Sequence, residues 1–582
     1  MSAFLQVEES LTGRRWLGPD VELARAAEAL EQATGLPAAV ASVLARRGVP
    51  AEEAEAFLAP TLRDTLPDPR SMKDMETAAT RLLTAIKAGE RVAVFADYDV
   101  DGGSSAALII DWMRGFGQSP TLYIPDRIEE GYGPNVPAME MLAADNPLII
   151  CVDCGTLSHE PIAAAVAKGA DVVVLDHHLG GETLPPALAV VNPNRQDEMG
   201  APGYLCAAGV VFLMLVEAGR QLREAGQKGP DLMALLDLVA LATVADVAPV
   251  IEANRARVVQ GLKIMARRAR PGLVALSDVA RMNTAPAPYH LGFLLGPRVN
   301  AGGRIGAADL GARLLATTDP HEAVAMAQKL DQLNTERREI EADVLAGATM
   351  QAEERGLEAP LVWAAKDGWH PGVVGIVASR LKEAANRPAV VIGFDGDEGK
   401  GSGRSVSGID LGAAIQRLAT EGLIERGGGH KMAAGLSLSR AQLEPAMERL
   451  SELLEKQGAA ALGPRDLKLD GLLMPGAATP ELIEQIETAG PFGAGAPGPR
   501  FAFPDQQISF TKPVGQSHLK IGFGDGLGAR LEAIAFGAFD TALGPTLMNH
   551  GGARFHLAGR LELNHWNGRV TPQLRLEDAA KA

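Results

Sequence analysis

The stretch VFADYDVDGG (residues 94–103) places aspartates on alternate positions directly after an apolar run. Carboxylates about 4 Å apart repel each other by about 4 kcal/mol at an effective dielectric constant of about 20. A fold that gathers Asp97, Asp99 and Asp101 therefore needs a bound cation, protonation, or exposure on a solvated turn. An EF-hand calcium loop shares the D-x-D-x-D-G pattern but requires a glutamate at its twelfth position. That position is Leu108 here, and the cluster follows a strand-like run, so the EF-hand interpretation fails.

Further acids and histidines follow other apolar runs. Asp153 comes directly after PLIICV, and Asp176, His177 and His178 come directly after VVVL. Asp246 lies in LATVADVAPV, where a helical run ends before a proline. Beyond the first segment of the chain, short apolar runs alternate with amphipathic stretches, which predicts a mostly parallel sheet covered by helices. Because such sheets bind ligands at the carboxyl ends of their strands, we expect these side chains to converge in one crevice.

Converging carboxylates are costly to fold without a counterion, and two divalent cations resolve this conflict. Paired catalytic metals lie about 3.5–4 Å apart, typically with one bridging carboxylate. A ligand set of aspartates and one histidine suits Mn²⁺, with Mg²⁺ as the alternative, and it lacks the cysteines typical of structural zinc. Taken alone, Asp153 is typical of a turn residue and His177 of a loop histidine. The joint occurrence of the whole set indicates a catalytic metal site.

Composition narrows the class of protein. The chain has 582 residues, of which 47% are hydrophobic, and this length predicts several domains. It has three cysteines and no visible signal peptide, and none of its apolar runs approaches the ~20 residues of a membrane helix. We therefore expect a cytoplasmic protein without a membrane partner. The C-x-x-C pair of Cys151 and Cys154 has no second pair to complete a zinc site, so we interpret both as core thiols.

The net charge of −17 argues against loose binding of polyanions but leaves room for a local basic groove. One run, RARVVQGLKIMARRARPG (255–272), holds six cationic residues and no acid, which taken alone is typical of a solvated helix face. The loop GGGHK (427–431) lacks the spacing of a P-loop, although its backbone N–H groups could hold a phosphate. Aromatic residues make up only 4% of the chain, so few platforms for base stacking are expected.

The pattern along the chain separates five segments. Residues 1–75 look helical and carry no readable motif. An α/β region over 76–318 is followed by a polar helix over 319–355, which would span on the order of 50 Å. A smaller α/β region with glycine-rich loops covers 356–458. Short alternating segments such as FHLAGRLEL predict a small β-domain, barrel or sandwich, over 463–580.

Several motifs resemble those of a known family. DYDVDG, VDCG, DHH and ATVADVAPV resemble, in order and spacing, the four motifs of the DHH phosphoesterase superfamily. GPRVNAGGRIG, GWHPGVVGIVASRL, GSGRSVSGIDL and GGGHKMAAG, together with PGYLCAAGVVF, are similar to the RecJ branch and its DHHA1 domain. The resemblance covers nearly the whole chain. It implies an α/β fold in which a long helix joins a parallel-sheet DHH domain to a smaller α/β DHHA1 domain, with an OB-fold β-barrel at the C-terminus.

The activity that this resemblance implies is that of a metal-dependent exonuclease. Such an enzyme would hydrolyse single-stranded DNA in the 5′→3′ direction to 5′ mononucleotides, in recombination and repair. The implied partners are single-stranded DNA, single-stranded-DNA-binding protein and a RecQ-type helicase, and the implied state is a monomer near the bacterial nucleoid. Two alternatives stay open: a DHH-family phosphodiesterase for short oligonucleotides, and a non-catalytic replication scaffold.

The resemblance also implies roles for the acids and histidines. One cation would be held by Asp97, Asp99 and Asp153. The other would be held by Asp101, Asp153, His177 and Asp246. Asp153 would bridge the two, and His178 would contact the scissile phosphate.

DNA contacts are implied at two further motifs. Phosphates beside the metal site would bind Arg298, Asn300 and Arg304. The 5′ end or nearby phosphates would bind Arg404, Ser405 and His430. The chain departs from its relatives at two positions. Phe95 stands where the pyrophosphatase branch has a histidine, which argues against a pyrophosphatase, and Ala496 stands where relatives often carry asparagine.

Overall fold

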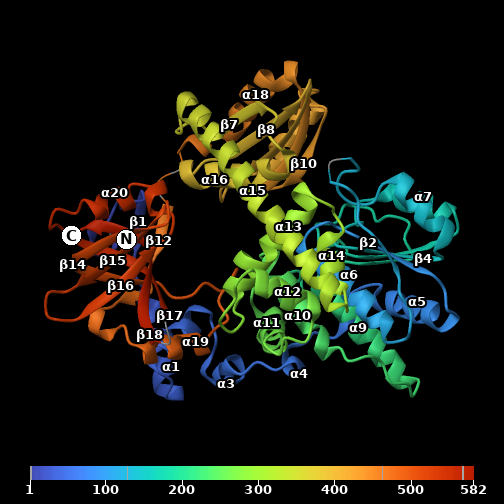
Figure 1. Cartoon of the computed structure of the whole chain (residues 1–582), viewed down its shortest axis with the longest axis horizontal. Coiled ribbons are helices and arrows are strands. Elements are labelled where there is room, and N and C mark those ends of the chain that lie inside the picture. Colours follow the sequence, from blue (N-terminus) through green and yellow to red (C-terminus); the bar gives the residue numbers. More distant parts are fainter. Residues whose placement is uncertain (1–2, 128, 462, 464, 567–568) are drawn as a thin grey trace. The chain divides into compact units, whose positions relative to one another are not determined.

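The computed structural model describes residues 3–127, 129–461, 463, 465–566 and 569–582. It divides the chain into two compact units (Figure 1). The larger unit is Leu62–Leu462 with Gly493–Gly495, and the smaller is Met1–Thr61 with Gly463–Phe492 and Ala496–Ala582. Among the described helices, none combines the length and the apolar character that crossing a membrane requires.

The first α/β region of the larger unit is built on a parallel sheet with the strand order β3-β2-β4-β5-β6. Every residue of β2 and β4 is buried, as expected for strands covered on both faces. Helices α5, α6 and α9 pack together on one side of the sheet, and α7 packs against α8 on the other. The strands are β2 (Val92–Ala96), β3 (Thr121–Tyr123), β4 (Leu148–Val152), β5 (Asp171–Leu175) and β6 (Ala189–Val191). The helices are α4 (Leu62–Thr65), α5 (Met75–Ala88), α6 (Val100–Arg114), α7 (Val136–Asp145), α8 (His159–Ala167) and α9 (Ala207–Glu224).

A layer of helices follows the sheet. Helix α10 is buried over most of its length, which explains its nearly continuous apolar sequence. It packs against α6 and α11 and ends at Asp246, its C-cap residue. A π-helical turn, η5, leads directly into α13. The elements of this layer are α10 (Leu236–Ala245), α11 (Glu252–Met265), α12 (Pro271–Val279), η5 (His290–Leu295), α13 (Gly296–Ile305) and α14 (Leu310–Ala316).

The long polar helix predicted over 319–355 is α15 (Pro320–Arg355). Asp319 caps it, since its side chain accepts hydrogen bonds from the backbone N–H groups of His321 and Glu322. Helix α15 packs against α12, α13 and α14, and also against α16 and β7 of the second α/β region. It therefore joins the two regions, as Figure 1 shows.

The second α/β region contains a mixed sheet with the strand order β10-β11-β9-β8-β7, in which only the β7–β8 pairing is parallel among the described strands. One face packs against α17 and α18, and α16 covers β8 and β9. The strands are β7 (Val362–Asp367), β8 (Ala389–Asp395), β9 (Glu398–Arg404), β10 (Arg426–His430) and β11 (Ala433–Ser439). The helices are α16 (Pro371–Ala385), α17 (Leu411–Thr420) and α18 (Leu443–Lys456).

The smaller unit contains a closed β-barrel. Its sheet runs β13-β14-β15-β16-β18-β17, and a further pairing of β14 with β17 closes it around a core that includes Phe503, Phe523 and Phe555. The strands are β13 (Gly471–Leu472), β14 (Phe501–Val514), β15 (His518–Gly524), β16 (Arg530–Ala535), β17 (Arg554–Trp566) and β18 (Arg569–Lys581). Its helices are α19 (Pro480–Thr488) and α20 (Leu543–Met548). The barrel, the parallel sheet and the connecting helix together confirm the predicted fold class.

The N-terminal segment belongs to the barrel unit, a relation that the sequence did not predict. Strand β1 (Arg14–Leu17) pairs in parallel with β12 (Arg465–Lys468). Trp16 is completely buried, and its indole N–H donates to the carboxylate of Asp578 at 2.8 Å. The helices of this segment are α1 (Val21–Thr34), α2 (Ala38–Arg46) and α3 (Ala54–Leu58).

Candidate metal centre

The first aspartate cluster lies at the turn between β2 and α6. Asp99 is the N-cap of α6, and its side chain accepts hydrogen bonds from the N–H groups of Asp101 (2.8 Å) and Gly102 (3.1 Å). A Cβ on Gly102 would lie 2.4 Å from the carbonyl oxygen of Asp97, so only glycine permits this turn. Within the first turn of α6, the carboxylate of Asp101 accepts hydrogen bonds from two N–H groups at the start of α9, those of Ala207 (2.6 Å) and Ala208 (2.8 Å).

The other acids and histidines are presented by the ends of β4 and β5. Asp153 follows β4 directly and has a positive φ of 60°, a conformation that aspartate tolerates better than most residues. Asp176 follows β5 and accepts hydrogen bonds from the hydroxyl of Thr156 (2.7 Å) and from the Nδ1 of His178 (2.8 Å). Asp176 therefore orients the second histidine of the DHH motif.

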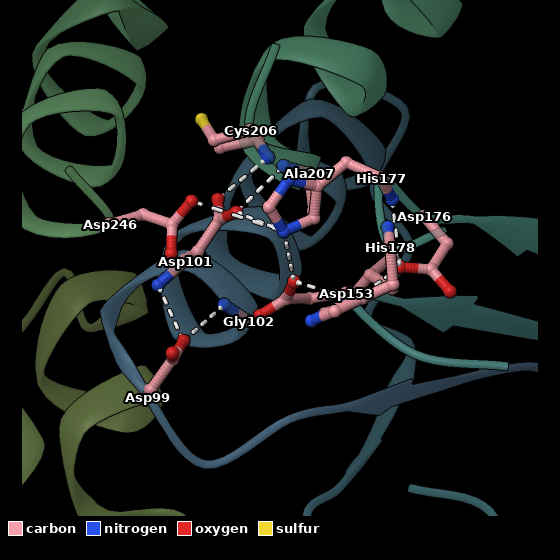
Figure 2. Close-up of polar contacts among 12 residues, drawn as sticks. Asp99, Asp101, Gly102, Asp153, Asp176, His177, His178, Cys206, Ala207 and Asp246 are labelled. Carbon is pink, nitrogen blue, oxygen red and sulfur yellow. Dashed lines mark hydrogen bonds and ion pairs between the residues drawn. The ribbon is translucent and has the colours of Figure 1, made fainter. Parts of the chain in front are cut away.

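These segments converge on the imidazole of His177. Figure 2 shows its ring between three carboxylates. Its Nε2 lies 3.2 Å from Asp153, 3.7 Å from Asp101 and 3.9 Å from Asp246. Asp97, Asp99 and Asp153 form a second group, whose oxygens lie within 4.8 Å of one another. The expected convergence is thus observed, and Asp153 belongs to both groups.

The donor set fits a pair of hard divalent cations. Within the described part of the chain, the buried oxygens Asp97 Oδ1 and Asp153 Oδ1 have no hydrogen-bond partner. Burial, and then the neighbouring carboxylates, raise the pKa values of Asp97 and Asp153 well above the usual range. The same causes raise the pKa of Asp246 to about 9. Bound cations would give both oxygens a partner and would offset the repulsion between the carboxylates. Carboxylates with imidazole are a ligand set that Mn²⁺ accepts.

His178 is paired with an acid of its own, Asp176. Burial alone would lower its pKa, but the hydrogen bond and charge of Asp176 outweigh this and raise the pKa to about 9. Conversely, burial would raise the pKa of Asp176, but its bonds to His178 and Thr156 lower it instead. The hydrogen bond to Asp176 therefore favours the charged form of the His178 imidazole, beside the predicted metal ligands.

Tyr132 lies beside Asp153 and His178, and the sequence did not predict a role for it. Its hydroxyl donates to the carbonyl oxygen of Asp153 at 3.1 Å and lies 3.3 Å from the Nδ1 of His178. Tyr132 is nevertheless 54% exposed. The motif EGYGP, in a loop before α7, is the signal that could have drawn attention to it.

The acidic cluster opens into a cavity of about 430 Å³ between the two α/β regions of the larger unit. Asp97 and Asp99 line one part of it, and the guanidinium groups of Arg127, Arg304 and Arg404 line another. Burial, and then the charge of Arg127, lower the pKa of Arg304 to about 10 and also lower that of Arg404. Because the charge of Arg127 disfavours both of the other guanidinium groups, this part of the cavity is suited to an anion.

The residues predicted to bind DNA are placed differently from one another. Asn300, Arg304 and Arg404 line the cavity. Arg298 instead pairs with Asp331 at 2.8 Å. Ser405 is buried, and its hydroxyl donates to the carbonyl oxygen of Ile409.

The exposed His430 ends β10. The sequence analysis gave no role to the remaining cavity-lining residues, which are Tyr98, Arg127, Tyr132, Gly375, Ile376, Ser379, Arg380 and Glu383. Phe95, the departure noted above, is part of the apolar core and contacts the ring of Tyr123.

Comparison with known proteins identifies the family. Profiles described as "DHH family, N-terminal domain", "DHHA1 domain" and "RecJ OB domain" match residues 91–243, 358–456 and 469–578. RecJ of Dickeya dadantii (strain 3937) is 38% identical over 568 residues, which cover 93% of this chain and 96% of that protein. The chain belongs to the RecJ family. RecJ of Dickeya dadantii is described as a single-stranded-DNA-specific exonuclease.

Solved RecJ structures agree with the fold and contain the expected cations. RecJ from Thermus thermophilus in complex with Mn²⁺ has a TM-score of 0.79 and 30% identity, and the match covers 97% of this chain and 79% of that one. The complex with Mg²⁺ from the same organism has a TM-score of 0.72 and 28% identity, with coverage of 97% and 78%. The expected cofactors, Mn²⁺ or Mg²⁺, are thus those found in RecJ.

Proposed function

We propose that this chain is a metal-dependent exonuclease that hydrolyses single-stranded DNA from its 5′ end and releases 5′ mononucleotides. The observation that carries this proposal is the shared cavity, in which carboxylates suited to cations and guanidinium groups suited to a phosphate face the same space. A strand end bound there would present its terminal phosphate to the arginines and its next phosphodiester to the metal centre.

In this proposal the acidic cluster holds two divalent cations. Asp97, Asp99 and Asp153 would hold one of them, and Asp101, Asp153, His177 and Asp246 would hold the other. When bound, such a pair lowers the pKa of water and stabilises charge on phosphate oxygens. His178, oriented by Asp176, would donate a hydrogen bond to a non-bridging oxygen of the scissile phosphate. Tyr132 holds the loop of Asp153 and the ring of His178 in place.

Selection of the 5′ end follows from charge. A terminal phosphate monoester carries more negative charge than an internal diester, so it gains more from the convergent Arg127, Arg304 and Arg404. Asn300 lines the same cavity. We assign Arg298, Ser405 and His430 supporting roles. Arg298 fixes α13 through Asp331, Ser405 fixes the turn after β9, and His430 contacts the DNA backbone at the exposed end of β10.

The proposal extends to the setting of the reaction. The OB domain would bind single-stranded DNA through backbone charge and base stacking. The chain would act as a monomer in the bacterial cytoplasm, near the nucleoid, in recombination and repair. Single-stranded-DNA-binding protein and a RecQ-type helicase would present its substrate.

Degradation of end-labelled DNA tests the proposal. Single strands labelled at either end should lose a 5′ label first, as mononucleotide, in the presence of Mn²⁺ or Mg²⁺, and should stay intact with a chelator. Asp153→Ala should abolish this activity, whereas Asp145→Ala, at an exposed ion pair with Arg91, should not. Unchanged cleavage by Asp153→Ala would refute the metal-centre assignment. A wild-type chain that binds but never cleaves DNA would favour the scaffold alternative, and one that cleaves only dinucleotides would favour the short-oligonucleotide alternative.

A further inference from the structure

The basic run at residues 255–272 is only partly the solvated helix face that its sequence suggests. Three of its six cationic residues are exposed, but Arg270 is largely buried, with 11% of its side chain exposed. Its guanidinium group donates to the two carboxylate oxygens of Asp237 at 2.9 and 3.2 Å, and also to Asp111. Asp111, Asp237 and Arg270 therefore form an ionic triad inside the first α/β region of the larger unit.

The ionic triad joins the ends of several helices. Asp111 lies near the C-terminal end of α6, Asp237 lies in the first turn of α10, and Arg270 is the N-cap of α12. Gly272 permits this close approach, because a Cβ there would overlap the backbone of α14. Arg270 also donates to the carbonyl oxygen of Leu315 in α14 at 3.3 Å. One guanidinium group thus links α6, α10 and α14.

The other ends of α6 and α10 carry two ligands of the same predicted cation. The two helices pack against each other (Figure 1) and run in opposite directions, so Asp101 and Asp246 lie together at the metal centre. Ten residues separate Asp101 from Asp111, and nine separate Asp237 from Asp246. At about 1.5 Å per residue, these separations are about 15 Å and about 13.5 Å along the helix axes. The two helices therefore match in length between the ionic triad and the metal centre.

Asp246 depends on the axial position of α10. The carboxylate of Asp101 is fixed by the N–H groups of Ala207 and Ala208, but among the described residues no hydrogen bond holds the carboxylate of Asp246. The turn after α10 holds Val247 at a φ of 60°, which is an outlier for a β-branched residue and persists only where the surrounding structure enforces it. A shift of α10 along α6 would therefore displace Asp246 directly.

An ionic triad suits the fixing of register better than the gain of stability. The desolvation of buried charges largely offsets their attraction, so well-packed apolar side chains would hold the same helices at least as firmly. Apolar packing specifies axial position weakly where side chains are small, and residues 102–107 of α6 are all glycine, serine or alanine. Directional bonds from one planar guanidinium group to two carboxylates define that position more closely.

We propose that Arg270 is a positioning residue for the metal centre, which sets the spacing of Asp101 and Asp246 by holding the far ends of α6 and α10 in register. The inference rests on the proposed function, because it concerns one of its two cations. Without this register, Asp101 and Asp246 no longer lie together around the Nε2 of His177, so the cation there is bound more weakly. The other cation should keep its affinity, because its predicted ligands lie on the turn between β2 and α6 and directly after β4.

Titration of the chelator-treated protein with Mn²⁺ tests this role in Arg270→Met, with the free cation measured by electron paramagnetic resonance. The wild type should bind two Mn²⁺ ions, and Arg270→Met should bind one of them at least tenfold more weakly. Arg81→Met is the matched control, because Arg81 is also largely buried, at 13%, and pairs with Glu90 and Asp171 at the opposite edge of the parallel sheet. Both variants should lower the urea midpoint, but only Arg270→Met should weaken Mn²⁺ binding. Equal Mn²⁺ affinities in Arg270→Met and the wild type would overturn the proposal.

A second variant removes the ionic triad without leaving a buried charge unpaired. It combines Asp111→Leu, Asp237→Leu and Arg270→Met, so its fold should be at least as stable as that of the wild type. One Mn²⁺ ion should still be bound at least tenfold more weakly, because apolar side chains do not restore the register. Recovery of wild-type Mn²⁺ affinity in this variant would overturn the proposal, since the ionic triad would then act through stability alone.

The same titration separates this inference from the proposed function. A wild type that binds two Mn²⁺ ions, with the affinity for one of them lost in Arg270→Met, supports the positioning role even if the chain cleaves no DNA. Only the proposed function would then fail. A wild type that cleaves single-stranded DNA, while Arg270→Met binds both ions with full affinity, overturns the positioning role alone.

Discussion

Replacing Asp246 by asparagine isolates the electrostatic cost of the acidic cluster. Burial and the neighbouring Asp101 raise the pKa of Asp246 to about 9 from a reference value of 3.8. At pH 7 this carboxyl is protonated in the folded chain without cations and ionised in the unfolded chain. One pKa unit corresponds to about 1.36 kcal/mol. The folded chain must bind a proton that the unfolded chain lacks, and this lowers the free energy of unfolding by about 4 kcal/mol at pH 7 and by about 2 kcal/mol at pH 5. Asparagine has the same shape and no such cost.

The sign of the pH dependence follows from proton binding. Because the folded chain retains the proton that the unfolded chain loses, this group's contribution to stability is fully present below pH 3.8 and is lost as the pH rises toward 9. Without cations, Asp246→Asn should therefore be more stable than the wild type by up to about 2 kcal/mol at pH 5 and up to about 4 kcal/mol at pH 7. The side chain is 26% exposed, so solvent screening makes these values upper limits.

Urea unfolding followed by tryptophan fluorescence measures this difference. Trp112, one of the chain's five tryptophans, is buried in α6, the helix that carries Asp101, so part of the signal reports on this region. The chelator-treated proteins are compared at pH 5 and pH 7, and then at pH 7 with saturating Mn²⁺, where the wild type should gain more stability than the variant. A stability difference that does not grow with pH, or equal stabilisation of both proteins by Mn²⁺, would refute the reasoning.

Three further substitutions probe the site and the fold. Tyr132→Phe removes the hydroxyl bound to Asp153 and His178 but keeps the ring, so kcat on labelled single strands should fall about tenfold, at about 1.4 kcal/mol per factor of ten, with KM nearly unchanged. A changed KM with normal kcat would contradict this role. Arg404→Lys keeps the charge but loses the planar guanidinium group. The preference for 5′-phosphate over 5′-hydroxyl ends should therefore drop several-fold in competition assays. An unchanged preference would contradict the role of the arginine-lined cavity. Asp578→Ala leaves the buried indole N–H of Trp16 unpaired and should lower the stability of the barrel unit by roughly 1–3 kcal/mol, seen as a lower urea midpoint.

The metal-centre geometry followed from the sequence because a parallel sheet imposes it. Apolar runs ending in Asp97, Asp153 and Asp176 could only bring those residues to one edge, and the structure has them there. Asp246 was harder to place, because its position depends on how α10 packs against α6 rather than on strand order. The acids themselves indicated a metal site, because so many carboxylates at strand ends have few explanations other than bound cations.

The cavity beside the metal centre could not be derived in the same way. Arg127 and Tyr132 lie in a loop with no periodic pattern, and their importance appears only when the second α/β region is placed beside them. Ser402 and Ser405 look equivalent in GSGRSVSG, yet Ser402 lines a groove shared with Tyr98, Arg127 and Tyr132, while Ser405 is buried and bonds to Ile409. Such distinctions depend on tertiary contacts and on the face of each strand, which local sequence does not encode.

The pairing of β1 with β12 has a consequence for how the chain is made. About 400 residues separate the two parts of the barrel unit, so at about 5–20 residues per second the N-terminal segment waits roughly 20–80 s on the ribosome for its partner strand. During that interval Trp16 lacks the strand and the carboxylate that cover it, and the apolar cluster of α1 and α2 lacks Ala489 and Phe492. A chain that ends before β12 would leave the N-terminal segment without its partner strand and open to proteolysis.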